Sequence, residues 1–500
     1  MKIKTFYGSV TALLAGLLCT QIIATIQVYC SNAALYRSLE VLKDEGYRIV
    51  PNEIVMIGLN DVSPAFFGGL FFTLTLGAGL ACAGLACVWL WDRLCVRRTG
   101  ALALIFLLWC LGVVFVNREG CTLFGTLYFG MIPPVVFLTA LWIMPRGAQG
   151  RFSPVELIPL IPLVILAALW VPHMEARTFS DIRDNLLLTT SAGIAIAESY
   201  YRYTLYPAHA FKSLDQRLLK TCRLEGFDTP SIKKSLAGRL VHYDYLPVTD
   251  NVHSVDCIVS GSAAAGMVAF SYKGRTVLAR PLGKFLAFPG DTLKEYSRRL
   301  DRHRFLRAAT FSSLLFASPL LLYILIYAVI YALCLVHLRA LPASIIASGV
   351  CLAVGVIFLG LLLVQGGAVS EDPRAALSSP LVKERIGALR GTERLNALID
   401  EYRQGGHLPG NSPVAERYWL ARALASGRSF ETCRMLYSFL DDPNPMVRYV
   451  AFNSLGKRGG PDAVGEIERR IPHLEDWYSQ LYAYKALRKL GWTQKYPHTH

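Results

Sequence analysis

The sequence predicts an α-helical membrane protein with about seven spanning helices, a small α+β domain outside the membrane and a C-terminal α-solenoid. Three observations support this fold class. Of the 500 residues, 53% are hydrophobic and 17% are charged, and the mean hydropathy is +0.38, whereas soluble domains carry about 25% charged residues. Long apolar runs alternate with two polar regions, and the second polar region is repetitive. The composition excludes an ordinary soluble enzyme.

Seven apolar segments are long enough to cross a bilayer core, which takes about 20 residues as a helix. Their interiors carry no Lys or Arg. Backbone polar groups in hydrocarbon are satisfied only in a helix or a closed barrel, so we expect helices. The segments are residues 7–29, 66–91, 101–117, 122–144, 154–172, 307–338 and 341–365.

The first segment has the features of a signal anchor. It follows Lys2 and Lys4, and no A-x-A-like cleavage site ends its apolar run, which continues to about Cys30. Basic residues in the short loops favour an N-terminus on the inner side. We therefore predict a bacterial-type inner membrane protein with a cytoplasmic N-terminus. Regions 173–306 and 366–500 are separated by two spans, so both are expected on the opposite, periplasmic side.

This topology divides the chain into four parts. Residues 1–172 form a five-helix membrane region with the signal anchor, and residues 173–306 form an extramembrane α+β domain. Residues 307–365 form a two-helix membrane hairpin, and residues 366–500 form a helical repeat domain.

The net charge of +15 does not indicate a nucleic-acid site. No basic stripe on a recognisable nucleic-acid-binding module is visible. The densest excess lies in residues 173–307, with 20 basic and 13 acidic residues, where anionic headgroups of a lipid bilayer are the expected counter-charge. Aromatic and basic residues typical of a membrane interface lie there. They are Tyr200, Tyr201, Tyr203, Tyr206, Arg298, Arg299 and Arg302.

The twelve cysteines form no C-x-x-C pair and no zinc-type spacing, so we predict no metal and no cofactor. Most lie in or beside the apolar segments and act there as small apolar residues. Cys30 and Cys121 both fall near the predicted outer face, so a disulfide between them remains an open alternative.

Small residues and prolines mark the predicted membrane helices. In the second segment the pairs Gly77/Ala81 and Gly79/Ala83 lie four residues apart, a spacing that lets helix backbones approach closely. We expect a compact bundle, with contact to another membrane subunit as the alternative; Gly349/Ala353 repeats the pattern more weakly. Prolines such as Pro133-Pro134 predict kinks, and broken helices also occur in transport pathways.

The middle region is predicted to be α+β. Residues 181–222 are expected to be helical, and strands are expected at Leu240–Tyr245, Val255–Ser260, Gly266–Tyr272 and Arg275–Arg280. Lys273-Gly274 between the last two suits a hairpin. Residues 281–289 are expected to form a loop, and Asp291–Arg304 a polar helix that leads into the sixth span.

Only weak catalytic candidates occur in this region. His242, Asp244 and His253 lie near Cys257 in the sequence, and strand alternation would place His242 and Asp244 on one face. No nucleophile elbow, zinc-protease motif, P-loop or dinucleotide fingerprint is present.

The C-terminal region is repetitive. Pro380, Pro413 and Pro445 recur at nearly equal intervals, and each opens a helical stretch; a further helix is expected at Trp477–Leu490. The run Asp-Asp-Pro-Asn-Pro-Met-Val-Arg-Tyr-Val-Ala that starts at Asp441 resembles the HEAT-like repeat family, of the type also seen in bilin-lyase repeat proteins. Arg448 matches the arginine of that family's motif, and Arg417 is a looser match. The resemblance covers about 130 residues and implies an α-solenoid, but not bilin chemistry.

Such solenoids present an extended face to a partner. The candidate partner-binding residues are Tyr418, Trp419, Arg448, Trp477, Tyr478 and Tyr482. The leading functional hypothesis is therefore a membrane-anchored scaffold or assembly subunit that docks a protein through its repeats and its same-side α+β domain. A transporter or channel with a regulatory repeat domain is one alternative. A membrane-embedded enzyme acting on a lipid-linked substrate is the other.

Overall fold

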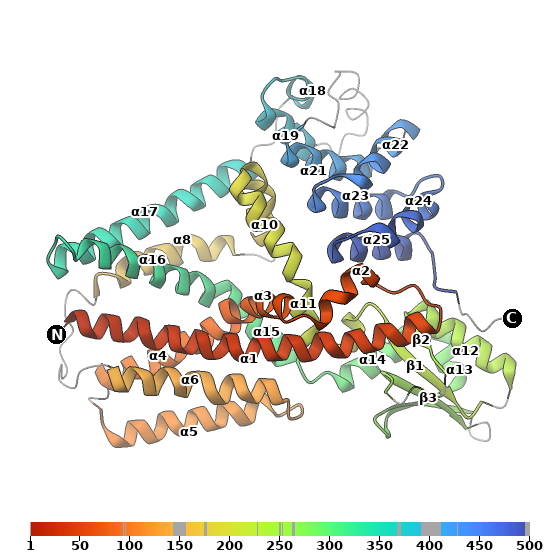
Figure 1. Ribbon diagram of the computed structural model, residues 1–500, viewed down its shortest axis with the longest axis horizontal. Coiled ribbons are helices and arrows are strands. Elements are labelled where there is room, and N and C mark those ends of the chain that lie inside the picture. Colours follow the sequence, from red (N-terminus) through yellow and green to blue (C-terminus); the bar gives the residue numbers. More distant parts are fainter. Residues whose placement is uncertain are drawn as a thin grey trace.

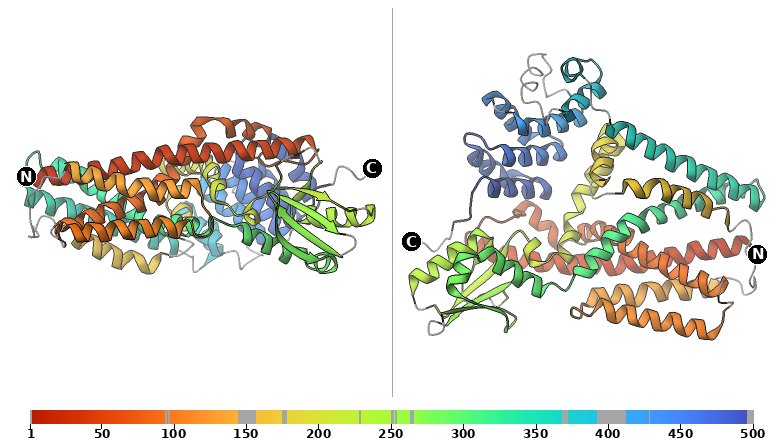
Figure 2. Two further views of the ribbon diagram at one scale, coloured as in Figure 1. Left: turned by 90° about the horizontal axis from the view of Figure 1, so that it is seen from below. Right: turned by 180° about the vertical axis from the view of Figure 1, so that it is seen from behind.

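The protein consists of a bundle of long helices, a five-stranded sheet domain and a C-terminal set of short helices (Figure 1). Both smaller parts lie toward the end of the bundle that is distant from the N-terminus (Figures 1 and 2). This arrangement comes from a computed structural model. It describes residues 2–93, 95, 97–143, 157–174, 178–227, 229–249, 252, 254–262, 266–367, 372–391, 412–427 and 429–495.

Helix α1 (Lys2–Asp44) runs the whole length of the bundle. Its 43 residues extend about 64 Å at 1.5 Å per residue, about twice the thickness of a bilayer core. The apolar segment predicted at residues 7–29 forms the first part of this helix, which continues beyond it to Asp44. The following residues remain good helix formers, and the chain turns only at Gly46, whose φ is +80°. The outer third of α1 is therefore a rigid extension beyond its apolar part.

Among the described residues, six helices are long and apolar enough to cross a membrane, or seven if a pair bent by 94° is one span. They coincide with the described parts of the seven predicted segments; residues 144 and 154–156 lie outside the described residues. They are α1, α3–η2–α4 (Val62–Phe72, Thr73–Gly77 and Ala78–Arg93), α5 (Thr99–Val116), α6 (Leu123–Ile143), α15–η8–α16 (Arg304–Ser312, Ser313–Ala317 and Ser318–Cys334) and α17 (Ala340–Gly367). The bent pair is α8–η3 (Leu160–Trp170 and Val171–His173) with α9–η4 (Thr178–Asn185 and Leu187–Thr189).

The small residues of the second span bring helices together within the chain, as predicted. A Cβ on Gly77 would lie 2.4 Å from Thr20 on α1, and one on Gly84 would lie 3.2 Å from the Pro133 carbonyl on α6. Helix α6 remains continuous through Pro133-Pro134. By contrast, Gly349 on α17 has no described atom within 4 Å of its Cβ position. The close packing is thus built around α1, α4 and α6.

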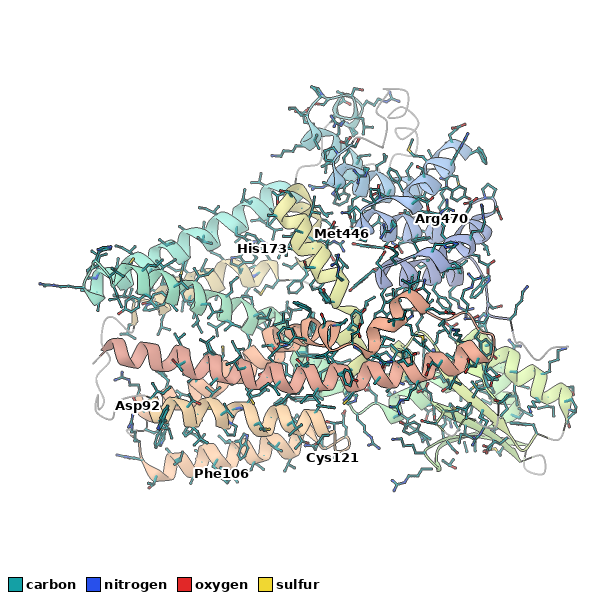
Figure 3. The ribbon with its side chains drawn as sticks, in the orientation of Figure 1. Asp92, Phe106, Cys121, His173, Met446 and Arg470 are labelled. Atoms are coloured by element: carbon teal, nitrogen blue, oxygen red, sulfur yellow. The ribbon has the colours of Figure 1, made fainter. Side chains whose placement is uncertain are left out.

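The helices fall into two groups on either side of α1. Helix α5 packs on α6, and α6 packs on α1 and α4. Helices α8 and α16 pack on α17 at the other side (Figure 1). Phe106 lies on the outer side of α5 (Figure 3) and is 61% exposed. Other large apolar side chains of α5, among them Leu107 and Leu111, are exposed as well.

The sheet domain contains one mixed sheet in the order β2-β1-β3-β4-β5. Strand β1 is parallel to β2 and β3, whereas β3, β4 and β5 form antiparallel pairs. Helices α12, α13 and α14 bury one face of the sheet through residues such as Leu236, Phe285 and Tyr296. The bounds are β1 Lys220–Glu225, α12 Pro230–His242, β2 Tyr245–Pro247, β3 Cys257–Ser262, β4 Met267–Tyr272, β5 Arg275–Pro281, α13 Leu282–Ala287 and α14 Pro289–Leu300.

Three predictions in this domain need correction. Residues 220–222 open strand β1 rather than ending a helix, and residues 240–242 end α12 rather than opening a strand. The expected loop after Pro281 contains α13. Residues 220–222 are all buried, so the alternation of buried and exposed positions that marks a half-buried strand is absent there. The β4–β5 hairpin was predicted correctly, with Lys273 and Gly274 both at positive φ.

Between the bundle and the sheet, the chain forms α10 (Ser191–Tyr203), α11 (Leu205–Ala208), η5 (His209–Phe211) and η6 (Leu214–Gln216). The C-terminal domain consists of short helices, of which α19, α21, α23 and α25 pack in series. The bounds are α18 Pro373–Leu377, α19 Val382–Gly391, α21 Val414–Ala423, α22 Phe430–Ser438, α23 Pro445–Arg458, α24 Ala463–Arg470 and α25 Trp477–Lys489. Helices α22 and α24 lie on the side away from α10 (Figure 1).

Candidate functional site: a junction of three parts

A ladder of ion pairs connects the serial helices of the C-terminal domain. Arg385 on α19 pairs with Glu416 on α21 at 2.7 Å and donates to the Ser379 carbonyl. Arg417 repeats the arrangement with Asp442 at 2.8 Å. Arg448 pairs with Asp476 at 2.7 Å and donates to the Asp442 carbonyl. The three arginines recur at almost the same interval as the prolines that open the predicted repeats, so the same kind of contact recurs with the sequence period.

The ladder ends at a residue outside the domain. Gln480 on α25 follows Arg448 at the next such interval, and its Nε2 donates to the Leu474 carbonyl, as the arginines donate to theirs. Its partner is Asn52 in the turn after α1, where Gln480 Nε2 reaches Asn52 Oδ1 at 2.8 Å and the Asn52 N–H reaches Gln480 Oε1 at 2.7 Å. Asn52 Nδ2 also donates to carbonyls at the end of η13 (Ile471–His473).

Both amide side chains are buried, Gln480 at 0% and Asn52 at 8% exposure. A buried amide is costly unless its donors and acceptors are paired, and here they are. The turn after α1 therefore packs against α25, the last helix of the series.

A second pair of contacts adjoins this closure. Gln494 exchanges two hydrogen bonds with the backbone of Arg48, at 2.7 and 3.1 Å. The Arg48 guanidinium pairs with Glu468 at 3.3 Å and lies 5.7 Å from the centroid of the Trp492 ring. The same turn thus holds α24, α25 and the chain that follows them.

The sheet domain is attached to the same end of α1. Tyr47 donates its hydroxyl to the Pro247 carbonyl at 2.9 Å, and Glu45 accepts from the N–H and the hydroxyl of Thr249, both at 2.7 Å. The short segment that follows α1 therefore contacts both domains. The extension of α1 sets the position of each relative to the long helices.

Side chains from α9 and α10 cover the face of the C-terminal domain that points toward the long helices. Arg183 on α9 donates to the hydroxyls of Tyr201 and Tyr418 and pairs with Asp184. Asp184 is 3% exposed and also accepts from Arg422 on α21 at 3.3 Å. The rings of Tyr201, Tyr418 and Tyr449 lie 5.4 to 5.7 Å from the Arg183 guanidinium carbon, a distance at which cation–π attraction is effective.

Helix α10 adds an aromatic contact along this face. Tyr201 meets Tyr478 edge-on at 4.6 Å, and Tyr206 meets Trp477 edge-on at 5.2 Å. Thr204 is hydrogen bonded to the Tyr478 hydroxyl at 3.0 Å. Met446, at 0% exposure, is labelled where α10 and the C-terminal helices meet (Figure 3).

The residues predicted to bind a separate partner lie mostly at this internal face. Tyr418 is 1% and Trp419 is 9% exposed, so both side chains pack inside the chain in this structure, and their role in binding a partner stays a prediction. The guanidinium carbons of Arg390 and Arg422 each lie 4.9 Å from the Trp419 ring centroid. The remaining four predicted residues contact their own chain. Arg448 is in the ladder, Trp477 and Tyr478 contact α11 and α10, and Tyr482 contacts Tyr449.

The weak catalytic candidates do not form a constellation among the described residues. Asp244 accepts the Tyr484 hydroxyl at 2.6 Å and pairs with Arg488 at 3.5 Å, and burial raises its pKa. His242 ends α12 with its side chain exposed, and its carbonyl accepts from Arg488. The predicted shared strand face was wrong, because the two residues lie on a helix end and a turn. His253 lies outside the described residues. Asp244 thus joins the sheet domain to α25 of the C-terminal domain.

The predicted interface residues have mixed roles. Tyr200 is 51% exposed, Tyr203 stacks on Phe67 at 4.7 Å, and Tyr201 and Tyr206 face the C-terminal domain. Arg298 and Arg302 are exposed. Arg299 pairs with Glu295 at 2.6 Å and donates to the Val277 carbonyl on β5, the edge strand.

Polar residues missed by the sequence analysis line the interior of the bundle. Thr73 donates to Gln21 at 2.7 Å, and Gln21 donates to the Phe66 carbonyl at 2.9 Å. Two π-helical turns, η2 and η8, pack against each other, and Ser318 after η8 donates to the Leu74 carbonyl in η2. Such turns occur often at functional sites or bends.

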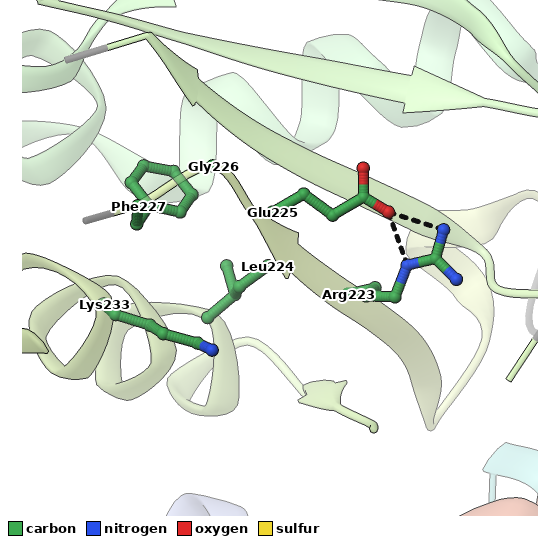
Figure 4. Close-up of a pocket in the computed structure, with 6 residues that line it drawn as sticks. All are labelled: Arg223, Leu224, Glu225, Gly226, Phe227 and Lys233. Atoms are coloured by element: carbon green, nitrogen blue, oxygen red, sulfur yellow. Dashed lines mark hydrogen bonds and ion pairs between the residues drawn. The ribbon is translucent and has the colours of Figure 1, made fainter. Parts of the chain in front are cut away.

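A pocket of about 490 Å³ lies at the end of β1 (Figure 4). Its charged lining includes Lys233 and the pair Arg223–Glu225, joined at 2.6 Å. Since Arg223 already has a carboxylate partner and Lys233 is exposed, the pocket holds no charge that needs a ligand.

Over the described ranges, no group of three or more His, Cys, Asp and Glu side chains could hold a metal ion. Cys30 and Cys121 are free and exposed, so the disulfide considered above is absent from the structure. Comparison with family models, curated proteins and solved structures finds no match.

Proposed function

We propose that the protein is a membrane-anchored scaffold whose two outer domains form one preassembled platform for a protein partner. The observation that carries the proposal is the turn after α1, which binds the sheet domain through Tyr47 and the C-terminal domain through Asn52. A single apolar helix thereby fixes both domains. The long apolar helices and exposed side chains such as Phe106 favour insertion in a bilayer.

The C-terminal helices support the interpretation as HEAT-like repeats. They pack in series, and the arginine ladder recurs with the sequence period. In such arrays each unit contacts its neighbours, and the terminal units need a cap. Asn52 and Gln480 supply a cap at one end.

The partner-binding surface on this domain is the layer formed by α22 and α24. The opposite face is covered by α9 and α10, and the far end by the turn after α1. On α22, Phe430 is 66% exposed beside the exposed side chain of Arg434. An apolar ring bordered by charge is typical of a protein contact.

Site-specific photo-crosslinking in native membranes tests the proposal. A photoreactive amino acid at position 430 should yield a crosslink to a second polypeptide. The same residue at Lys234, which is exposed on α12, is the control. Absence of any product from position 430, in membranes where the protein is present at its natural level, would contradict the docking function.

The transporter alternative has one observation in its favour, the facing π-helical turns beside Gln21 and Thr73. Helix α8, however, packs mainly on α17. A proteoliposome flux assay with Gln21→Leu would test it. Selective loss of flux of any solute would favour transport. The lipid-linked enzyme alternative rested on His242, Asp244 and His253. Asp244 is hydrogen bonded to Tyr484 and paired with Arg488, and His253 lies outside the described residues.

A further inference from the structure

Four arginines lie at the outer ends of the long helices without an acidic partner. Arg298, Arg302 and Arg304 surround the junction of α14 and α15, and Arg118 is in the turn between α5 and α6. All four side chains are exposed, and no described carboxylate lies within ion-pair distance of any of them. We name this set the basic rim.

Two neighbouring arginines of the same segment, in contrast, form contacts that hold parts of the structure together. Arg307 pairs with Asp301 at 2.9 Å and donates to the Phe211 carbonyl at 2.8 Å. Arg299 pairs with Glu295. Arg307 and Arg299 therefore join elements of the fold, whereas the four arginines of the basic rim have no acidic partner among the described residues.

The arginines of the basic rim come from two separate parts of the chain, and one contact shows that these parts lie side by side. A Cβ on Gly120, in the turn between α5 and α6, would lie 2.8 Å from Arg302 Cδ. Arg302 thus lies across the end of that hairpin, where Cys121 is labelled (Figure 3). Arg118 lies in the same turn, 5.2 Å from the Phe115 ring.

The surrounding side chains have the composition of a membrane interface. Phe115 is 47% and Leu123 is 68% exposed. Helices α5, α6 and α15 begin or end here, so a bilayer that covers their apolar parts places the arginines at headgroup depth. Glu119 is the acidic side chain within the turn, so the rim is strongly cationic.

We infer that the basic rim binds the phosphate headgroups of anionic phospholipids. Guanidinium groups donate hydrogen bonds in a planar fork that fits phosphate oxygens, and each cation near an anionic lipid surface strengthens binding about fivefold. The inference rests on the proposed membrane insertion. It specifies a lipid class that the scaffold proposal leaves open, and it orients the platform against the outer leaflet.

Native mass spectrometry of the full chain in neutral detergent, titrated with short-chain phosphatidylglycerol or phosphatidylcholine, tests the inference. The wild type should retain phosphatidylglycerol preferentially. The variant Arg298→Gln, Arg302→Gln, Arg304→Gln should bind it roughly 100-fold more weakly. The matching Arg→Lys triple variant should keep most of the affinity, because it keeps the charge.

The matched control removes three exposed cations from the C-terminal domain, with Arg434→Gln, Lys457→Gln and Lys495→Gln. Equal weakening in both triple variants would overturn the site and leave only general charge attraction. Displacement by an equal concentration of inorganic phosphate would overturn the lipid assignment. Resistance of the protein to alkaline extraction from membranes tests insertion separately, and crosslinking at position 430 tests docking separately.

Discussion

The two faces of the C-terminal helical domain differ in what covers them. The face toward the long helices buries Arg183 and Asp184 among tyrosines of α10, α21 and α23. The opposite layer, α22 and α24, leaves Phe430 exposed. One face is therefore an intramolecular interface, and the other is the surface that we propose for docking. The difference teaches that most aromatic side chains of this domain pack within the chain, so aromatic content alone does not indicate an exposed surface.

The largest expected effect is at the buried face. Asp184→Ala leaves the guanidinium groups of Arg183 and Arg422 without their shared carboxylate. Removal of one member of a buried charged group costs about 3–5 kcal/mol. We expect a clearly lower Tm and faster proteolysis of the C-terminal domain. Arg434→Ala on the other layer should change stability by less than about 0.5 kcal/mol; equal Tm values for both variants would contradict the comparison.

A pH effect follows from Lys212, next to η5 on the covered side. Burial, with a smaller effect of Lys485 and Arg217, lowers its pKa from 10.5 to about 8. Between these values the unfolded chain binds more protons, so stability rises with pH from about 8 to 10.5. Below pH 8 the charged lysine costs about 2–3 kcal/mol. Lys212→Met should therefore raise Tm at pH 7 and flatten its rise above pH 8.

Lys495→Met, at an exposed position, is the control for that titration. If both variants have the same Tm profile from pH 7 to 10.5, Lys212 is solvated and the covered side is less closely packed than described.

A moderate effect is expected at the end of the ladder. Gln480→Ala leaves the Asn52 N–H without its acceptor and removes one of the two donors to Asn52 Oδ1, which keeps the Val55 N–H. An unsatisfied buried polar group costs about 1–3 kcal/mol. Hydrogen exchange of residues 46–56 should accelerate. Lys485→Ala on the same helix should leave that exchange unchanged; unchanged exchange in Gln480→Ala would show that the turn is not held by α25.

The smallest effect on stability is expected at Phe430. Phe430→Asp removes an exposed ring, so the free energy of unfolding should change by less than about 0.5 kcal/mol. Association with the partner should nevertheless be lost, because exposed aromatic anchors dominate interface energies. Co-purification of the partner from native membranes measures this association. Tyr200→Asp, at an exposed tyrosine elsewhere, is the control. Equal partner recovery from both variants would argue against the α22 layer.

Local patterns predicted the long helices, the β4–β5 hairpin and the helix starts near Pro413 and Pro445 well. Each depends on residues adjacent in sequence. The extension of α1 was missed because apolarity, and not helix propensity, set its predicted end. Strand β1 was missed because residues 220–222 pair with strands that come later in the chain.

The site was harder to predict than the fold. Arg417 and Arg448 stood out through the repeat, and Arg385 carries the same signal at the same spacing. Asn52 and Arg183 carry no comparable signal. Their importance comes from partners that are distant in the sequence, such as Tyr418 for Arg183, at a separation of 235, and Gln480 for Asn52, at a separation of 428. A single sequence does not specify such contacts.

Paired photo-crosslinking from the two faces tests the central claim most directly. With the photoreactive residue at Tyr482, on the covered face, peptide mapping should find an intramolecular crosslink to residues 191–203. With the residue at Phe430, it should find a crosslink to a second polypeptide. Capture of another polypeptide from Tyr482, with none from Phe430, would contradict the account.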